Sequence, residues 1–370
     1  MGSKVPKADH KKMRVGLVLG AGGVMGGAWI TGGLQALAAE TGWDPATADH
    51  IIGTSAGSML GALLAAGIPP WFMVDHSAGA TFDGLLGADG RPAESADRSG
   101  GAQYTLDRSW PRPMLGSPAL ARRLLSNPRS LPPIGGLVAL GPRGFVSTEP
   151  LKDIIRRVVP TGWAPHPNFW AVAAEYDSLD RVAFGSPGAP RAELADAVAA
   201  SCAVPAFYHP VEIDGKLYLD GGVNSVSNAD LLRDAGLDLV ICLNPMSSRH
   251  RPQGLRPGAR IGAAMRSGYG RRLGQETRLL REAGTQVVLV QPTARDLRVM
   301  GNNYMSGKRR NEVIHAAIAT VGEQLRQADN WSLLRDLPQG RPHRLSRPTG
   351  VSPKRLRELL ELPTPTRGTA

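Results

Sequence analysis

Residues 16–37, GLVLGAGGVMGGAWITGGLQAL, begin as an apolar run, break into glycines and resume with helical spacing. This pattern predicts a buried strand over residues 14–20, a tight glycine turn and a helix over residues 26–40. Residues 49–67, DHIIGTSAGSMLGALLAAG, repeat the plan with a turn centred on Ser55. Two strand–turn–helix units in succession predict an α/β fold with a mainly parallel central sheet.

The later part of the chain keeps this alternation of strands and helices. Ser147 or Thr148 can cap a helix that starts within STEPLKDIIRRVV. Asp214 and Gly215 predict the turn of a hairpin over residues 211–222. Further strands are expected at residues 169–176, 180–185, 237–244 and 285–292, and further helices at 192–201, around 262–283 and around 308–327.

One long segment breaks the alternation. From about residue 81 to residue 144, Gly, Pro, Ser and Arg dominate, which is typical of a lid or an insertion, with short helical patches such as SPALARRLLS (117–126). We therefore expect a basic N-terminal extension over residues 1–13, one folded domain over 14–330 that contains this segment, and a Pro/Arg-rich tail over 331–370.

The charge balance favours an anionic partner. The chain has 43 Lys and Arg against 32 Asp and Glu, a net charge of +11, which suits nucleic acid or an acidic lipid surface. Aromatic residues make up 5% of the chain and do not alternate with basic ones, so we expect no nucleic-acid partner. Cys202 and Cys242 form neither a disulfide framework nor a metal-ligand pattern, which favours a cytoplasmic setting and no metal. No apolar run reaches the roughly 18 residues that a spanning helix needs.

The sequence GTSAG, residues 53–57, matches the G-x-S-x-G pattern of a nucleophile elbow. In such an elbow a serine lies on a sharp turn between a strand and a helix, where its hydroxyl is presented to substrate. Glycine two positions to either side lets the chain crowd that closely, and the following helix directs its N-terminal amides at the site. The strand and helix expected around Ser55 supply this context, so the motif predicts a nucleophilic serine.

The glycines after the first strand fit two different tasks. A dinucleotide-binding turn has the pattern G-x-G-x-x-G, with an acidic residue about 20 positions on at the end of the second strand. From Gly20 the spacing is G-x-G-x-x-x-G, and the second strand ends in Gly-Thr-Ser without a carboxylate. The other task is an oxyanion hole, whose amides would come from Ala21, Gly22 and Gly23. The sequence favours the oxyanion hole, with an NADP-binding oxidoreductase as the alternative.

Together with a third motif, Asp220-Gly221-Gly222, these patterns resemble the patatin-like phospholipases, whose catalytic arrangement is shared with cytosolic phospholipase A2. That family combines a glycine-rich oxyanion turn, a G-x-S-x-G elbow and a later D-G-[G/A] acid; similar motifs here are AGGVMG (21–26), GTSAG and DGG. The resemblance runs from about residue 14 to residue 326. It implies a three-layer α/β fold and a serine hydrolase that cleaves carboxylic esters of lipids, phospholipid or lysophospholipid, with no cofactor. The implied site residues are the dyad Ser55 and Asp220, the oxyanion-hole residues Ala21, Gly22, Gly23 and Val24, and the motif glycines Gly26, Gly53, Gly57, Gly221 and Gly222.

In this family Ser55 would form an acyl-enzyme and Asp220 would act as its base without a histidine. Met25 departs from the pattern, because it replaces the usual basic residue of the oxyanion turn. His250 or His315 would complete the Ser, Asp, His order of a hydrolase triad, but only one strand is expected before Ser55, which is unlike that fold. His209 could line the pocket.

A lipid substrate and a basic chain lead us to expect peripheral contact with an anionic membrane surface, to which the Arg-rich tail would contribute. A catalytically inactive lipid-binding protein with the same fold is a further alternative. The sequence leaves the oligomeric state open.

Overall fold

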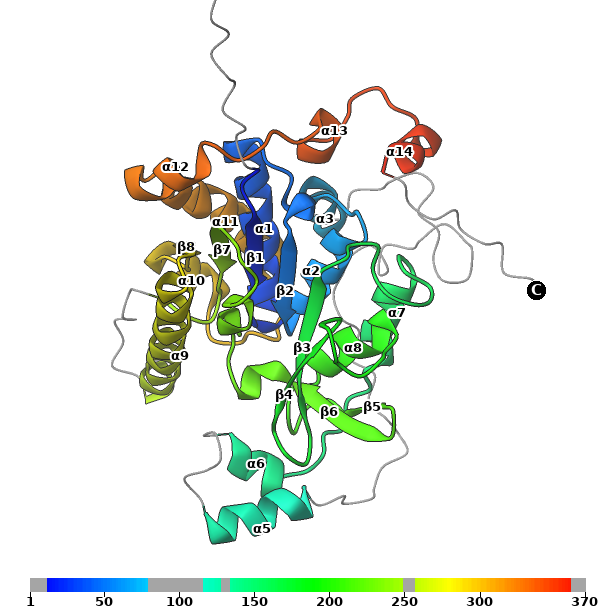
Figure 1. The fold of residues 1–370 in the computed structure, drawn as a ribbon, viewed down its shortest axis with the longest axis vertical. Helices are drawn as coiled ribbons and strands as arrows, with labels where there is room; N and C mark the ends of the chain where they lie inside the picture. Colours follow the sequence, from blue (N-terminus) through cyan, green and yellow to red (C-terminus); the bar gives the residue numbers. More distant parts are fainter. Residues whose placement is uncertain (1–11, 79–115, 128–133, 249–256, 361–370) are drawn as a thin grey trace, which may run out of the picture.

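The structure is a computed structural model, and it describes residues 12–78, 116–127, 134–248 and 257–360 (Figure 1). Much of the segment 81–144, in which a lid or insertion is expected, therefore lies outside the described residues, as do most of the basic extension and the last ten residues of the chain. Within the described part, the helices and strands are organised around one sheet.

The sheet has eight strands in the order β5-β6-β3-β2-β1-β7-β8, with β4 paired to β3. Neighbouring strands from β3 through β2, β1 and β7 to β8 are parallel, and in this register Leu17 lies opposite Ile51 and Ile241. Strands β4 and β6 pair with β3 in the antiparallel sense, and β5 pairs with β6 in the same way. The strands are β1 Val15–Leu19, β2 His50–Thr54, β3 Phe169–Glu175, β4 Arg181–Phe184, β5 Val211–Ile213, β6 Lys216–Asp220, β7 Leu239–Leu243 and β8 Gln286–Val290.

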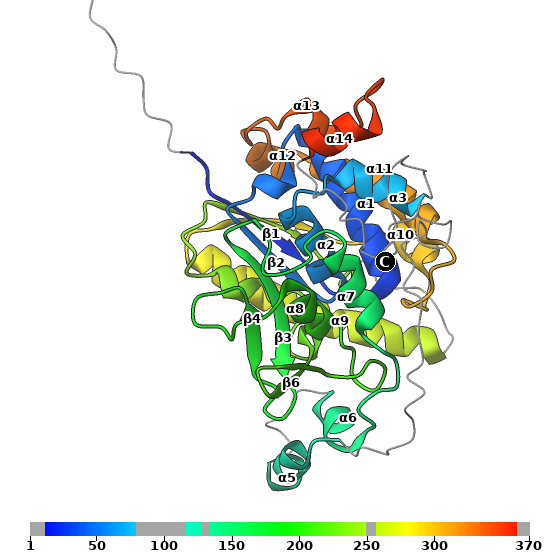
Figure 2. The same cartoon turned by 90° about the vertical axis from the view of Figure 1, so that its right-hand side faces the viewer.

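Helices cover both faces of the sheet (Figure 2). Most of them contribute to the larger hydrophobic cluster on one face: α1 Gly23–Thr41, α2 Ala56–Ala65, α3 Pro70–Ser77, α7 Glu149–Arg156, α8 Leu194–Ser201, α10 Ala294–Met300, α11 Arg310–Leu325 and α12 Ala328–Leu334. The other face is covered by α9 Pro257–Glu282 and the short 3-10 helix Ala229–Leu232. The remaining elements are α5 Pro118–Ser126, α6 Gly135–Leu140, α13 Pro342–Leu345, α14 Pro353–Leu359 and the 3-10 helices Pro45–Thr47 and Gly221–Val223.

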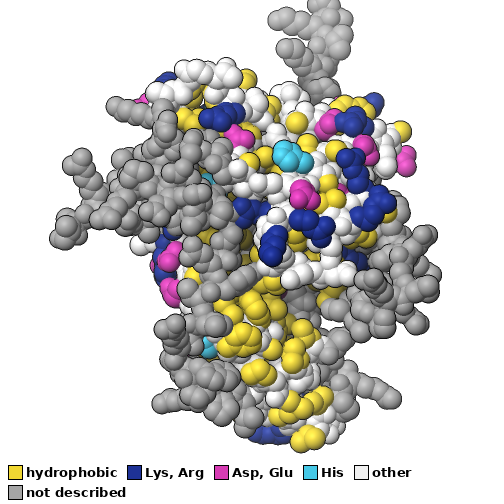
Figure 3. Space-filling model, turned by 180° about the vertical axis from the view of Figure 1, so that it is seen from behind, with side chains coloured by type: hydrophobic (Ala, Val, Ile, Leu, Met, Phe, Trp, Pro, Cys, Tyr) yellow, Lys and Arg dark blue, Asp and Glu magenta, His cyan; other side chains and the backbone are white. Residues whose placement is uncertain are grey.

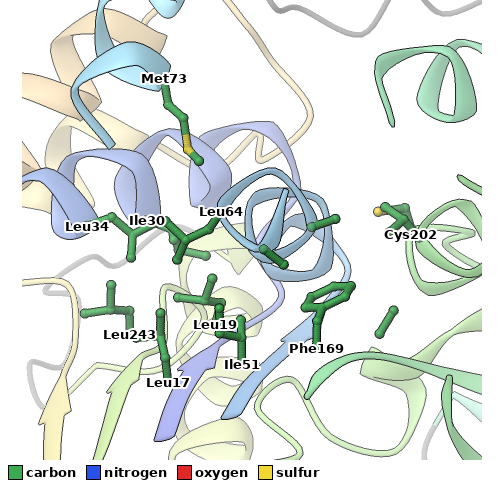
Figure 4. Close-up of a cluster of buried hydrophobic side chains, with 14 of the residues drawn as sticks. Leu17, Leu19, Ile30, Leu34, Ile51, Leu64, Met73, Phe169, Cys202 and Leu243 are labelled. Carbon is green, nitrogen blue, oxygen red and sulfur yellow. The ribbon is translucent and has the colours of Figure 1, made fainter. Parts of the chain in front are cut away.

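The central strands are buried on both sides, as an internal parallel strand must be. All five residues of β1 are buried, and its four side chains are divided between two clusters. Leu17 and Leu19 pack toward Ile30 and Leu34 of α1 (Figure 4). Val18 points the other way, into the cluster that contains Leu273 of α9. This alternation explains why the strand reads as a continuous apolar run.

The expected α/β fold with a mostly parallel sheet is confirmed. The hairpin also forms where it was expected, and its turn residues Asp214 and Gly215 have φ values of 51° and 71°, as this tight turn requires. Helix α1 begins at Gly23, three residues before the expected start, because the glycine turn itself enters the helix. None of the helices among the described residues has both the length and the apolarity needed to cross a bilayer.

Part of the Pro/Arg-rich tail packs on the body of the protein. Leu334 and Leu337 join the large core cluster. The guanidinium of Arg344 lies 2.8 Å from a carboxylate oxygen of Asp44. The indole of Trp71 donates to the backbone carbonyl of residue 343 at 3.1 Å. Helices α12 to α14 therefore lie at one end of the molecule, whereas α5 and α6 lie at the opposite end (Figure 1).

Candidate active site

Ser55 lies on the sharp turn between β2 and α2. Its φ and ψ are 54° and −124°, in a region that residues with a side chain rarely adopt. The flanking glycines make this turn possible. A Cβ at Gly53 would lie 2.5 Å from the carbonyl oxygen of Gly57, and one at Gly57 would lie 2.0 Å from the carbonyl oxygen of Leu19. The elbow thus needs glycine at both positions because α2 starts directly against β1 and β2.

Two other serines hold the elbow in place, and the sequence motifs do not indicate either of them. The amide of Ser55 donates to the hydroxyl of Ser201 at 2.9 Å, and that hydroxyl donates to the carbonyl of Val172 on β3 at 2.6 Å. The hydroxyl of Ser58 donates to the carbonyl of Ser55 at 2.7 Å. Both are fully buried, so these bonds fix the backbone of Ser55 in its strained conformation.

Asp220 ends β6 and meets Ser55. The hydroxyl of Ser55 lies beside its carboxylate, where as a hydrogen-bond donor it lowers the pKa of Asp220, and the amide of Gly222 donates to Oδ1 at 2.7 Å. Only 5% of either side chain of the pair is exposed. Burial raises the pKa of Asp220 to about 6, although the hydrogen bonds from Ser55 and Gly222 oppose this rise. The structure therefore brings together the two residues that the sequence proposed as a dyad.

The loop after Asp220 is tied to the elbow from the other side. Asn228, in a left-handed conformation with φ 51°, donates from its amide nitrogen to the hydroxyl of Thr54 at 3.0 Å. Its side-chain oxygen accepts a hydrogen bond from Arg181. The guanidinium of Arg181 also forms a bidentate ion pair with the carboxylate of Asp230, at 2.7 and 2.8 Å. Because Thr54 directly precedes Ser55, this network sets the position of the nucleophile relative to the loop that carries its base.

The glycine turn presents free amides to the same region. Among the described residues, the amides of Gly22, Gly23 and Val24 have no hydrogen-bond acceptor, as expected for the first residues of a helix. The expectation for Ala21 was wrong: its amide already donates to the carbonyl of Val226 at 2.7 Å, so it cannot serve an oxyanion. The positive end of the α1 dipole adds to the attraction for negative charge here.

Two segments that are distant in the sequence pack against this glycine turn. A Cβ at Gly22 would lie 2.7 Å from Cγ of Pro245, and one at Gly23 would lie 2.9 Å from the carbonyl oxygen of Tyr304. The same carbonyl accepts from the amide of Met25 at 3.0 Å. Gly23 also has a φ of 59°, so a side chain there would be strained whatever the space.

Arg266 of α9 forms hydrogen bonds with both of these segments, at Pro245 and Tyr304. Its Nη1 donates to the carbonyl of Pro245 at 3.1 Å, its Nη2 donates to the hydroxyl of Tyr304, and its guanidinium lies 5.1 Å from the centre of the Tyr304 ring. Both acceptors are neutral, and burial lowers the pKa of Arg266 to about 10. Met25, where the family usually has a basic residue, is instead buried in the core. A cation therefore lies near the glycine turn, but it comes from a part of the chain that no motif indicated.

Other titratable groups surround the pair. Burial raises the pKa of Tyr269, one turn after Arg266, and the charge of Asp220 raises it further. Burial also raises the pKa of the Cys202 thiol to about 12, again with a contribution from Asp220. Both groups stay protonated at neutral pH, so neither of them competes with the carboxylate of Asp220 for a proton.

The histidines do not join this arrangement. His315 is exposed on α11, which packs against the far side of α1, whereas Ser55 and Asp220 are buried. His250 lies outside the described residues. His209 is half-buried in the segment beside Ala203, whose carbonyl accepts from the amide of Asp220 at 2.9 Å. Within the described part of the chain, no group of three His, Cys, Asp or Glu residues could hold a metal ion.

Comparison with known proteins identifies one family, and solved structures show a remote likeness. The model of the patatin-like phospholipase family matches residues 17–233, a range that contains the glycine turn, the elbow and Asp220. A crystal structure of VipD from Legionella pneumophila is similar over 85% of this chain and 67% of its own, with 14% identity and a TM-score of 0.39. No curated protein matches the chain.

Proposed function

The chain belongs to the patatin-like phospholipase family, and we propose that it hydrolyses the acyl ester of a phospholipid or lysophospholipid through a covalent intermediate on Ser55. The family consists of carboxylic ester hydrolases, which makes this chain a lipid acyl hydrolase. The observation that carries the residue assignment is the position of the Ser55 hydroxyl, on a strained elbow, beside the buried carboxylate of Asp220.

In the proposed acylation step, Oγ of Ser55 attacks the ester carbonyl carbon while Asp220 takes its proton. The carbonyl oxygen becomes an oxyanion, which the amides of Gly22, Gly23 and Val24 stabilise. The intermediate then collapses: the bond to the leaving alcohol breaks, and Asp220 returns the proton to that alcohol. The product of this step is an ester of Ser55 with the fatty acid.

Deacylation repeats these roles with water as the nucleophile. Asp220 takes a proton from water as its oxygen attacks the acyl-Ser55 carbonyl, the same amides hold the oxyanion, and the proton returns to Oγ as the fatty acid leaves. A pKa of about 6 suits this task, because the carboxylate is ionised at neutral pH and yet is a stronger base than an ordinary aspartate. The buried setting thus lets one carboxylate act where other hydrolases use histidine.

Arg266 has a supporting role in this proposal. Its hydrogen bonds fix the positions of Pro245 and Tyr304. Because Gly22 and Gly23 pack against these two residues, Arg266 sets the direction of the turn amides. Its charge lies in a buried environment, where electrostatic attraction to a developing oxyanion is screened little. We regard it as a positioning residue.

The alternatives from the sequence fit less well. An oxidoreductase is at odds with the family, whose members are ester hydrolases. A dinucleotide site would also need a carboxylate at the end of β2, where Thr54 lies instead. An inactive lipid-binding protein would have no use for a strained serine beside a buried carboxylate with a raised pKa.

The test is covalent labelling with a fluorophosphonate probe, which reacts with activated serines. The wild-type protein should be labelled, Ser55→Ala should not, and the control Ser332→Ala, which alters an exposed serine of α12, should be labelled like the wild type. Hydrolysis of a panel of phospholipids, lysophospholipids and neutral glycerides then defines the substrate class. Labelling that survives in Ser55→Ala, or a wild-type protein that neither reacts nor hydrolyses any ester, would overturn the proposal.

A further inference from the structure

One end of the molecule concentrates its exposed apolar side chains. Among the described residues, five large hydrophobic side chains are exposed, and four of them lie between residues 125 and 145. They are Leu125 of α5 at 88%, Leu137 and Leu140 of α6 at 46% and 65%, and Phe145 just after α6 at 39%. We call residues 116–127 and 134–145 the α5–α6 face. Hydrophobic side chains gather over this lower end of the molecule in Figure 3.

The charged residues of the α5–α6 face are all basic. Its residues include Arg122, Arg123 and Arg143 and no aspartate or glutamate. Arg122 and Arg123 are exposed on the same short helix as Leu125. Exposed leucines next to arginines, without acidic neighbours in the face, match the two properties of an anionic bilayer surface, an apolar interior and negatively charged head groups.

This face packs on segments that adjoin β3 and β6, the strands beside the proposed site. Ser117, at the start of α5, donates to the carboxylate of Asp177 at 2.5 Å, and the amide of Phe145 donates to the carbonyl of Phe207 at 3.0 Å. Between α6 and this part of the body is a hollow lined by Val138, Arg143, Ala203 and Leu219, among others. Leu219 directly precedes Asp220 on β6, so the hollow is lined by the chain neighbour of the proposed base. The parallel strands β1 and β2 also point their carboxyl ends toward this end of the molecule (Figure 1).

We propose that the α5–α6 face docks on the surface of a bilayer that contains anionic phospholipid, and that it does so with its leucines inserted and its arginines at the head groups. The inference rests on the proposed function for its meaning, because a docked face would bring the dyad close to aggregated lipid esters. It differs from the expectation that the Arg-rich tail makes this contact, since α12 to α14 lie at the other end of the molecule.

The test measures cosedimentation with vesicles of phosphatidylcholine mixed with phosphatidylglycerol. All proteins carry Ser55→Ala, so that lipid hydrolysis cannot alter the vesicles. The double variant Leu125→Glu and Leu140→Glu should lose at least about tenfold in vesicle partitioning, since each inserted leucine is worth roughly that factor. Trp331→Glu is the matched control: it changes the one remaining exposed large hydrophobic side chain of the described residues, at 38%, at the opposite end, and should partition like the parent.

A charge variant provides an independent measurement. Arg122→Glu should weaken partitioning several-fold at low salt and much less at high salt or on vesicles of phosphatidylcholine alone. The same variants are also made with Ser55 unchanged. Their turnover of a soluble short-chain ester should match that of the wild type, which shows that folding and the site are intact.

Unchanged partitioning of the double variant, or an equal loss in Trp331→Glu, would overturn the proposal. A change in sedimentation coefficient on mutating the leucines, without a change in partitioning, would instead identify a second copy of the chain as the occupant. Because binding is measured without catalysis, a docking face in a protein that hydrolyses no ester would leave this inference standing and reject the proposed function.

Discussion

Replacing Asp220 by Asn should lower turnover by orders of magnitude and, at the same time, stabilise the fold at neutral pH. Burial raises the pKa of this carboxyl to about 6 from its ordinary value of 3.8. One pH unit corresponds to about 1.4 kcal/mol, so keeping Asp220 ionised costs the folded state about 3 kcal/mol relative to the unfolded chain. The folded state holds the proton more tightly, so this penalty grows as the pH rises from about 4 to about 6 and is complete above that.

Asparagine is neutral at every pH and can still accept the bond from the Gly222 amide. The free energy of unfolding of Asp220→Asn should therefore exceed that of the wild type by up to about 3 kcal/mol at pH 8, and the difference should vanish near pH 4. Urea denaturation followed by circular dichroism at both pH values measures this. Asp214→Asn, at an exposed turn, is the matched control and should show no such pH dependence.

Activity provides the second half of the same experiment. Loss of a general base typically lowers kcat by about 10² to 10⁴-fold, and kcat/KM of the wild type should rise with pH to a plateau with a midpoint near 6. A variant that is equally destabilised at both pH values would contradict the idea of a buried, costly carboxylate. A variant that keeps its activity would refute the role of Asp220 as the base.

Four further substitutions address the supports of the site. Gly23→Ala should lower kcat by roughly 10²-fold or more, because a displaced turn amide costs about 3 kcal/mol of oxyanion stabilisation; a melting temperature near that of the wild type would separate this effect from unfolding. Ser201→Ala should destabilise the protein by about 1–3 kcal/mol and slow probe labelling, because it leaves the amide of Ser55 without its acceptor; an unchanged labelling rate would show that the elbow holds without it. Arg266→Lys should lower kcat for a soluble ester with KM unchanged, and Tyr304→Phe should do so less, because the ring and the backbone carbonyl remain; a rise in KM alone would assign Arg266 to substrate binding instead.

The sequence predicts those parts of the site that follow from local chain geometry. The motif around Ser55 requires a particular turn, and the strand and helix patterns on either side place that turn at the end of β2. The hairpin that delivers Asp220 is likewise a local pattern with a recognisable turn. These elements form where the pattern predicts them, since each depends on neighbours within a few residues.

The supports of the site depend on contacts between distant parts of the chain, which periodicity cannot reveal. Ser201 reaches the amide of Ser55 across 146 positions, and Arg266 of α9 meets Tyr304 across 38 positions. The assignment of Ala21 failed for the same reason. Its amide is taken by Val226, a residue of the loop after the hairpin, and no local signal marks that partner.

The two cysteines of the chain, Cys202 and Cys242, make the protein suitable for site-specific spectroscopy. Both thiols are buried, and burial raises the pKa of each well above its ordinary range, so neither should react quickly with maleimides in the native state. A single new cysteine at Leu137 of α6 could therefore carry an environment-sensitive fluorophore without removal of the native thiols. The emission of that dye would report directly whether its surroundings change from water to hydrocarbon when vesicles are added.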